Sequence, residues 1–365
     1  MSSHSPATPL GSLQPLGVGI LGAGPVTQAI HLPSLARLRN ILEVRHIMDV
    51  DAAVAESVAA RVGAKHSTSM DALLGDPDVD IVAICSPHQF HADQVIAACR
   101  ARKKAVLCEK PFAMSGEEAA RISAVSAETG VPIIVGAMHT FDPGWLAAEA
   151  NWGDLPETAH TIRSSIVLPP NARFEDFATE IITRPASGTP DYRDVEVVKN
   201  ALRGGIMGLA IHDLPLVRRF TPDFEDLEVL QARHVRPFGY VISLRAGERI
   251  IELRAAMNKT WKPEWTFEAI SDDSALRVDF TPSYVQAGSA VATITRGTTS
   301  TTYGPYEHNG YEGEWRELAQ LALGTKQPPA AESLINDLTF AIAIADATVD
   351  VAAAEYANSH AGAHS

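Results

Sequence analysis

The stretch of sequence that decides the fold is GVGILGAGPVT, residues 17–27. Its apolar beginning, residues 17–21, predicts a β-strand, and two glycines follow in the next turn. The first glycine permits a tight turn, the second lets the backbone approach a pyrophosphate, and a helix expected over residues 26–38 points its free amide groups at the negative charge. Thr27 replaces the third glycine of the usual pattern, and a glycine pair also occurs where a chain only reverses. The flanking strand and helix favour a dinucleotide site with the cofactor-binding residues Gly22, Gly24, Pro25 and Val26.

An acidic residue, Asp49, follows the second expected strand, residues 43–48. A carboxylate at this point binds the adenosine ribose hydroxyls in dinucleotide-binding domains. The next residues are Val50 and Asp51 rather than Arg or Lys, so a 2′-phosphate would meet carboxylates and no cation. The sequence therefore predicts NAD as the cofactor in preference to NADP. The alternative is that Asp49 only caps a helix beginning near Ala52, a role that Asp51 fits better.

The first part of the chain, from Leu16 to about His139, alternates short β-branched runs with longer amphipathic stretches. This alternation is typical of βαβ units and a parallel sheet. Strands are expected at residues 17–21, 43–48, 79–85, 105–108 and 132–137, and helices at 26–38, 52–62, 92–101 and 116–128. The pattern predicts a doubly wound nucleotide-binding domain over residues 16–140.

The remainder of the chain has a different pattern, with several runs that alternate polar and apolar residues. Strands are expected at residues 161–168, 227–236, 240–245, 249–256, 265–270, 275–280 and 290–295, and helices at 212–220, 312–323 and 333–356. The fold class is therefore α/β with a C-terminal α+β domain, residues 141–356, that contains a largely antiparallel sheet. Residues 1–15 and 357–365 are expected to be flexible tails.

Composition excludes several classes of partner. The 365 residues carry a formal net charge of −14, which repels phosphate backbones and anionic lipid, so we expect neither nucleic acid nor a membrane as a partner. The opening segment, residues 1–14, has no basic start and no sustained apolar run, so it is expected to be neither a signal peptide nor a membrane anchor. The three cysteines have no CxxC or zinc-type spacing, which favours a reducing, cytoplasmic location and no bound metal.

Two polar segments follow neighbouring expected strands. Ser86, Pro87 and His88 end one apolar run, and Glu109, Lys110 and Pro111 end the next. Ligands of open α/β sheets bind outside the carboxyl ends of the strands, so both segments are expected to face the cofactor crevice. A lysine at a strand end is usually a solvated charge, but here it stands where the nicotinamide should lie.

Taken together, these segments resemble the glucose-fructose oxidoreductase, inositol dehydrogenase and rhizopine-catabolism family, written Gfo/Idh/MocA. The resemblance covers nearly the whole chain, and its segments are the glycine turn with His31, the Ser86-Pro87 turn with His91, Glu109-Lys110-Pro111, and GGIMGLAIHD at residues 204–213. It implies an N-terminal Rossmann domain and a C-terminal domain, residues 141–356, that serves substrate binding and oligomerisation. The open face of the second sheet would meet another subunit, giving a homo-oligomer. The resemblance also adds Ser86, Pro87, His91, Glu109 and Lys110 to the cofactor-binding residues.

The resemblance implies that Lys110 and His212 are catalytic and point at a substrate hydroxyl beside the nicotinamide. A histidine titrates in the range suited to taking a hydroxyl proton, and a lysine can hold the oxygen. The family commonly has an aspartate four residues before this histidine, where the present chain has Gly208. Asp213 could partly replace that aspartate, although adjacent residues do not share a helix face. His139 and Asp213 are candidate substrate residues.

These observations predict an NAD-dependent dehydrogenase that transfers a hydride between nicotinamide and a secondary alcohol of a sugar, cyclitol or glycoside. One alternative is a glycoside-cleaving enzyme in which transient oxidation acidifies a neighbouring C–H bond and permits elimination. Another is an NAD-binding regulator without catalysis, because a fold does not fix a function. Gly208 is the feature that keeps the last alternative open.

Overall fold

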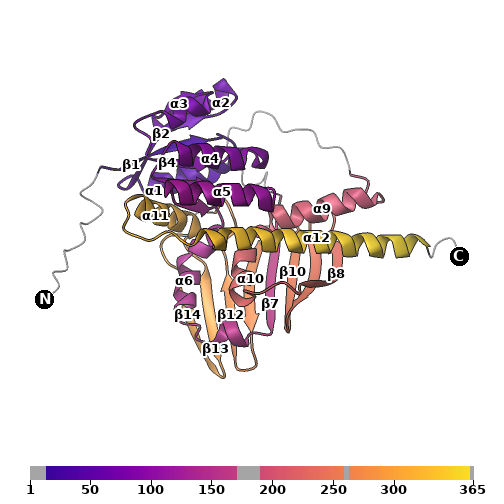
Figure 1. The fold of residues 1–365 in the computed structure, drawn as a ribbon. Coiled ribbons are helices and arrows are strands. Elements are labelled where there is room, and N and C mark those ends of the chain that lie inside the picture. The colour runs from indigo at the N-terminus through magenta and orange to yellow at the C-terminus, as the bar shows by residue number, and fades with distance from the viewer. Residues whose placement is uncertain (1–13, 171–189, 259–262, 286, 362–365) are drawn as a thin grey trace.

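The computed structural model describes residues 14–170, 190–258, 263–285 and 287–361. Most of the expected tail 1–15 and residues 362–365 of the expected tail 357–365 therefore lie outside the described residues. Figure 1 shows the nucleotide domain on one side and the second sheet on the other, with the long helix α12 (Ala331–Ala361) running between them.

The N-terminal domain contains a six-stranded sheet in which every neighbouring pair is parallel, with the order β3-β2-β1-β4-β5-β6. This is the doubly wound order that dinucleotide-binding domains use. The strands are β1 (Leu16–Leu21), β2 (Leu42–Met48), β3 (Lys65–Ser67), β4 (Ile81–Ile84), β5 (Ala105–Cys108) and β6 (Ile133–Val135). The helical segments are η2 (Thr27–His31), α1 (Leu32–Arg37), α2 (Ala52–Val62), α3 (Met70–Leu74), η3 (His88–Phe90), α4 (His91–Arg100) and α5 (Gly116–Thr129).

The central strands of this sheet are buried along their whole length, as expected for a parallel sheet with helices on both faces. The predicted fold is therefore confirmed, with two additions. Strand β3 and helix α3 were not expected from the sequence, because the strand has three residues, Lys-His-Ser, and no apolar run that could have indicated it.

The C-terminal domain is built on an eight-stranded sheet of order β14-β13-β12-β11-β7-β10-β9-β8, in which only the pair β7 and β10 is parallel among the described strands. The strands are β7 (Thr161–Leu168), β8 (Glu228–His234), β9 (Tyr240–Ala246), β10 (Arg249–Met257), β11 (Glu264–Ile270), β12 (Ser274–Asp279), β13 (Val291–Arg296) and β14 (Thr299–Tyr303). The predicted largely antiparallel sheet is confirmed. Strand β14 was missed because its sequence, TSTTY, has no apolar alternation.

One face of this sheet packs against helices, and no described helix covers the other face. Buried and exposed residues alternate along β9 and β12, which is the pattern of a sheet with one covered face. The remaining helical segments are η4 (Met138–Phe141), α6 (Pro143–Glu149), α7 (Leu155–Thr158), α9 (Val195–Gly208), η5 (Ala210–His212), α10 (Leu214–Phe220) and α11 (Gly310–Ala322). Helix α9 was not expected from the sequence, because three glycines near its end lower helix propensity.

The last two helices return to the nucleotide domain. Trp315 and Leu318 of α11 belong to the same buried cluster as Val18 and Ile20 of β1, and Leu338 of α12 packs with the α4 and α5 side of the sheet. The nucleotide domain is therefore completed by residues from the far end of the chain. The domain boundary at residue 140 stays a prediction, and side chains from both sides of it pack in the same hydrophobic clusters.

Candidate active site

The glycine turn after β1 has the geometry that a dinucleotide phosphate requires. Gly22 has φ of 95°, and a Cβ atom there would lie 2.7 Å from the carbonyl oxygen of Cys85, so only glycine fits. A Cβ atom on Gly24 would meet no atom within 4 Å, which leaves open space above the turn. The hydroxyl of Thr27 donates to the carbonyl oxygen of Gly22 at 2.6 Å, so the threonine braces the turn in place of a third glycine. The turn therefore fits a pyrophosphate at Gly24, followed by Pro25 and Val26 at the start of the helix.

The two acidic residues after β2 have separate roles. Asp51 caps α2, because its carboxylate accepts hydrogen bonds from the backbone N–H groups of Ala53 and Val54. Asp49 instead accepts from the backbone N–H of Ala23 at 2.8 Å. The carboxylate of Asp49 is therefore joined to the glycine turn, and the alternative that Asp49 caps α2 is excluded.

The turns after β4 and β5 are linked to each other. Ser86 Oγ donates to Gln94 Oε1 at 2.6 Å, and Pro87 precedes the short helical turn η3. His91 begins α4, and its two ring nitrogens lie 2.8 Å from the carbonyl oxygens of Ser86 and Pro111. The segments that the sequence placed at the crevice are thus in direct contact.

A buried hydrogen-bonded chain supports Glu109. The indole N–H of Trp315 donates to His31 Nδ1 at 3.2 Å, so Nε2 carries the proton that His31 donates to Glu109 Oε1 at 3.0 Å. Burial would raise the pKa of Glu109, but the hydrogen bond from His31, and after it the charge of Lys110, hold that pKa below its usual value. The second oxygen of Glu109 accepts from the backbone N–H of Lys110 at 3.2 Å. Trp315 and His31 therefore fix an anionic carboxylate beside Lys110.

The side chain of Lys110 crosses from the nucleotide domain to α9. Its amine donates to the carbonyl oxygen of Gly208 at 2.8 Å, and Gly208 is the last residue of the helix. Burial lowers the pKa of Lys110, and the charge of Glu109 opposes that shift. A backbone carbonyl at the end of a helix thus contacts the amine.

His212 lies in the short turn η5 and is almost completely buried, with 8% of its surface exposed. Its Nδ1 atom has no hydrogen-bond partner among the described residues. Burial, followed by the charges of Lys110 and His139, holds the pKa of His212 well below its usual value. The imidazole is therefore neutral at physiological pH and able to accept a proton.

One cavity between the domains brings these groups together, and we call it the interdomain cavity. It contains the helix start after the glycine turn, the end of β5, the end of α9 and the turn η5. Its lining residues are Val26, Ile30, Glu109, Lys110, Leu168, Gly208, Leu209, His212, Trp265, Ser283, Tyr284 and Tyr311. The structure thus places the two predicted catalytic residues on the same cavity as the glycine-turn helix.

The sequence did not indicate the hydroxyl-bearing residues of this cavity. Ser283 and Tyr284 follow β12, and Tyr311 lies in the first turn of α11, where its hydroxyl donates to Ser283 Oγ at 3.4 Å. These residues stand near no recognisable motif, so no sequence signal could have selected them. Trp265 of β11 is buried and also borders the cavity.

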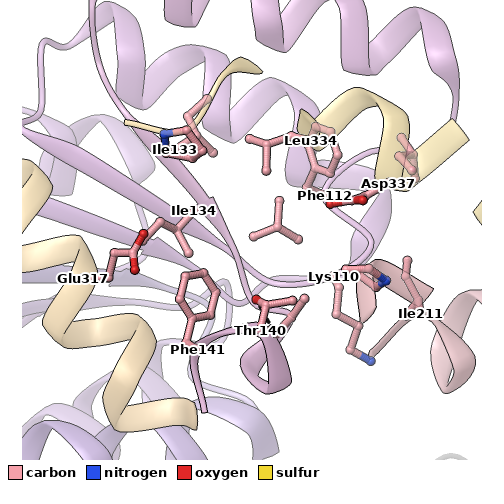
Figure 2. A pocket seen from close by; sticks show the side chains of 15 residues that line it. Lys110, Phe112, Ile133, Ile134, Thr140, Phe141, Ile211, Glu317, Leu334 and Asp337 are labelled. Atoms are coloured by element: carbon pink, nitrogen blue, oxygen red, sulfur yellow. Dashed lines mark hydrogen bonds between the residues drawn. The ribbon is translucent and has the colours of Figure 1, made fainter. Parts of the chain in front are cut away.

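A second cavity lies on the other side of the Lys110 stem and is almost entirely apolar. Figure 2 shows Ile133, Ile134 and Leu334 around it, with the amine of Lys110 pointing away from them. Two acidic residues also line it, and each is paired with a basic one: Asp337 with Arg218, and Glu317 with Lys326. The Lys110 amine and the His212 ring thus meet in the interdomain cavity and not in this second one.

His139 and Asp213 lie behind the interdomain cavity and do not border it. Asp213 is fully buried and accepts hydrogen bonds from His139 Nδ1, Ser164 Oγ and Trp265 Nε1 at 2.7, 2.6 and 2.8 Å. The ring of His139 stacks on Phe280. The Asp213 carboxylate therefore accepts hydrogen bonds from three protein donors and orients those side chains. It does not border the cavity, so it does not replace an acidic side chain at position 208.

Two further classes of site are absent from the described residues. No three His, Cys, Asp or Glu side chains in that part of the chain come together as ligands of a metal would. None of the described helices combines the length and the apolar character that crossing a bilayer requires.

Comparison with known proteins gives a consistent result. A sequence model of the oxidoreductase family with an NAD-binding Rossmann fold matches residues 16–137. Inositol 2-dehydrogenase of Acidothermus cellulolyticus is 31% identical over 225 residues, covering 58% of this chain and 65% of that protein. Inositol 2-dehydrogenase 3 of Saccharopolyspora erythraea is 34% identical over 157 residues, covering 42% of this chain and 46% of that protein. The chain thus matches less than two thirds of the length of either relative.

Solved structures extend the similarity of fold beyond the matched sequence. The UDP-N-acetylglucosamine 3-dehydrogenase from Acidithiobacillus ferrooxidans superimposes with a TM-score of 0.71 at 18% identity, covering 93% of this chain and all of that one. A 3-ketoreductase from Actinomadura kijaniata in complex with NADP gives 0.67 at 20% identity, covering 90% and 96%. Both comparisons support the two-domain fold. Residues 16–137 of the chain thus match the Gfo/Idh/MocA oxidoreductase family, whose model describes an NAD-binding Rossmann fold.

Proposed function

We propose that the protein is an NAD-dependent oxidoreductase that transfers a hydride between nicotinamide and a secondary alcohol of a sugar, cyclitol or glycoside. The observation that carries this proposal is the convergence of the Lys110 amine and a neutral His212 on the cavity that also contains Val26, at the start of the glycine-turn helix. The two inositol 2-dehydrogenase relatives support a polyol as the substrate class.

The chemistry divides among these residues according to their charge. NAD, when bound at the glycine turn, would supply the hydride acceptor for the carbinol carbon. Lys110, as an ammonium group, donates a hydrogen bond to the substrate oxygen, and His212 accepts the hydroxyl proton as the C–O bond becomes a carbonyl. Glu109 stabilises the ammonium form of Lys110. In the reverse direction the imidazolium of His212 returns the proton.

We expect the pH profile of kcat/KM to have two limbs, each centred below the ordinary pKa of the side chain that titrates. Oxidation requires neutral His212 and protonated Lys110, and the pKa of each group is lowered, chiefly by burial. The acidic limb of log kcat/KM should therefore fall below the usual histidine range, and the alkaline limb below the usual lysine range. Because Glu109 raises the pKa of Lys110, Glu109→Gln should move the alkaline limb further down. An unchanged alkaline limb in this variant would exclude Lys110 as the titrating group.

We also propose NAD as the preferred dinucleotide, on the basis of the carboxylates after β2. Asp49 lies at the glycine turn, and Asp51 caps the following helix, with the exposed Val50 between them. A 2′-phosphate beside Asp49 would meet like charge, which costs on the order of 1–4 kcal/mol at about 4 Å.

Asp49→Asn is expected to narrow the preference for NAD over NADP by about tenfold or more, because it removes that repulsion. The measurement is the ratio of the two dissociation constants, obtained by titration of the purified protein. Asp93→Asn on the exposed surface of α4 is the control. Binding of NADP to the native protein at least as tight as binding of NAD would contradict the proposal.

The substrate class is tested with a panel of sugars, cyclitols and glycosides, assayed for NADH formation. The proposal expects NADH with at least one member of the panel. Release of an aglycone without net NADH would instead select the glycoside-cleaving alternative. Tight NAD binding with no turnover of any member would select a regulator.

We propose that the protein self-associates through the open face of the second sheet. The exposed apolar residues Leu230 and Val241 on β8 and β9 support this. The ion pair between Arg245 and Glu228 on the same two strands is typical of the polar rim of an interface. Light scattering of the purified protein tests it: a multiple of the 39.1 kDa chain mass supports the proposal, and the mass of one chain contradicts it.

We further propose a cytoplasmic location. The three cysteines are all free thiols, and Cys99 and Cys108 are buried. Free thiols are typical of a reducing compartment. Fractionation of the native host, with the protein detected by antibody, tests this location.

A further inference from the structure

His91 is placed between the two turns that frame the crevice, and both of its ring nitrogens face acceptors. Nδ1 lies 2.8 Å from the carbonyl oxygen of Pro111, and Nε2 lies 2.8 Å from the carbonyl oxygen of Ser86. The side chain is completely buried, so water does not replace either contact. Carbonyl oxygens only accept, and each short contact therefore requires a proton on the ring nitrogen.

A neutral imidazole carries one such proton and would turn a lone pair towards the other carbonyl. The imidazolium form has two donors and satisfies both contacts. The N-terminus of α4, where His91 is the first residue, disfavours a cation, whereas two aimed carbonyl dipoles favour it. The nearest titratable ring is that of His88, at 5.4 Å between ring centroids. Burial, followed by the charges of His91 and Lys110, lowers the pKa of His88, so His88 stays neutral beside the imidazolium.

The two contacts join segments with different tasks. Ser86 belongs to the turn after β4, at the cofactor crevice, and Pro111 directly follows Lys110 in the turn after β5. The bond to Pro111 fixes the backbone from which the Lys110 amine extends to Gly208. The bond to Ser86 fixes the neighbouring turn against it.

We propose that His91 is a positioning residue, held as an imidazolium, whose two ring N–H groups fasten the Ser86 turn to the Pro111 turn and so direct Lys110 into the interdomain cavity. The effect on turnover rests on the proposed function. The protonation of the ring does not, and the two parts are therefore tested separately.

The protonation state is measured by nitrogen NMR of the protein labelled with ¹⁵N-histidine, with His91→Gln used to assign the signal. An imidazolium gives two ring nitrogens with similar shifts, whereas a neutral ring gives two widely separated shifts. We expect the similar pair at neutral pH. Widely separated shifts for His91 would overturn the proposal, whether or not a substrate is known.

The positioning role is tested with two variants that each keep one contact. The amide nitrogen of Asn matches the position of Nδ1, so His91→Asn keeps the bond to Pro111. The amide nitrogen of Gln matches Nε2, so His91→Gln keeps the bond to Ser86. We expect His91→Asn to raise KM for NAD about fivefold to tenfold while kcat stays near the native value. We expect His91→Gln to lower kcat about tenfold to a hundredfold with little change in KM for NAD.

A merely structural histidine would give a different result. Equal losses in both variants, or native values in both, would overturn the proposal. His91→Phe, which removes both contacts, should combine the two defects, and circular dichroism and thermal melting show whether each variant is folded. If no alcohol is turned over by the native protein, the proposed function fails, and the dissociation constant of NAD in His91→Asn replaces its KM as the test.

Discussion

Lys110→Ala is expected to lower kcat about 10²- to 10³-fold, the loss usually found when one positioned donor to a reacting oxygen is removed. The amine lies in the interdomain cavity with His212, and its ammonium form is the donor for the substrate oxygen. The dissociation constant of NAD should change little, because the residues proposed for the pyrophosphate and the ribose are in the glycine turn and at Asp49.

The measurement is the initial rate of NADH formation with the best substrate of the panel. Lys104→Ala removes an exposed lysine that pairs with Asp80 at the other end of the sheet, and should keep the native rate. Lys110→Arg should also be slow, because a planar guanidinium does not reproduce the compact ammonium. Native turnover in Lys110→Ala would refute the assignment of this residue.

His212→Asn is expected to lower kcat by about 10²- to 10⁴-fold, the usual contribution of a positioned general base. The variant retains a polar side chain in a nearly buried site, yet its amide cannot take the hydroxyl proton. The acidic limb of the pH profile should disappear together with the activity, because that limb reports the titration of His212.

The appropriate control is His160→Asn, which changes an exposed histidine at the start of the second domain. Its rate and its pH profile should match those of the native protein. An acidic limb that persists in His212→Asn, at a comparable rate, would assign the proton transfer to another group.

The sequence was sufficient to predict the nucleotide domain because the relevant signals there are local. The glycine turn requires a backbone conformation that glycine adopts readily and other residues do not, as the positive φ of Gly22 shows. The carboxyl ends of neighbouring parallel strands meet at one edge, so the polar ends of β4 and β5 could be placed beside each other from the sequence. The same local rule assigned the cap of α2 to Asp51 correctly.

The groups that support Lys110 could not be found in this way, because they come from distant parts of the chain. Trp315 reaches His31 across 284 positions, and Lys110 reaches Gly208 across 98. Nothing in the local sequence around Trp315 indicates that its indole would donate to a histidine. Such pairings are decided by the return of α11 to the nucleotide domain.

Gly208 and Asp213 show a different limit of prediction from sequence. The sequence identified the missing carboxylate at position 208, and the structure supplies a backbone carbonyl in contact with Lys110 at the same residue. A Cβ atom at Gly208 would meet no atom within 4 Å, so the position has room for a side chain that this chain does not have. The tertiary packing commits Asp213 to His139, Ser164 and Trp265, which the adjacent position in sequence does not reveal.

The most direct test of the account is a crystal structure of the protein grown with saturating NAD. The account predicts the pyrophosphate over Gly24 and the nicotinamide ring in the interdomain cavity, within contact distance of the Lys110 amine and the His212 ring. A dinucleotide bound elsewhere, an empty crevice, or a nicotinamide ring turned out of this cavity would contradict it.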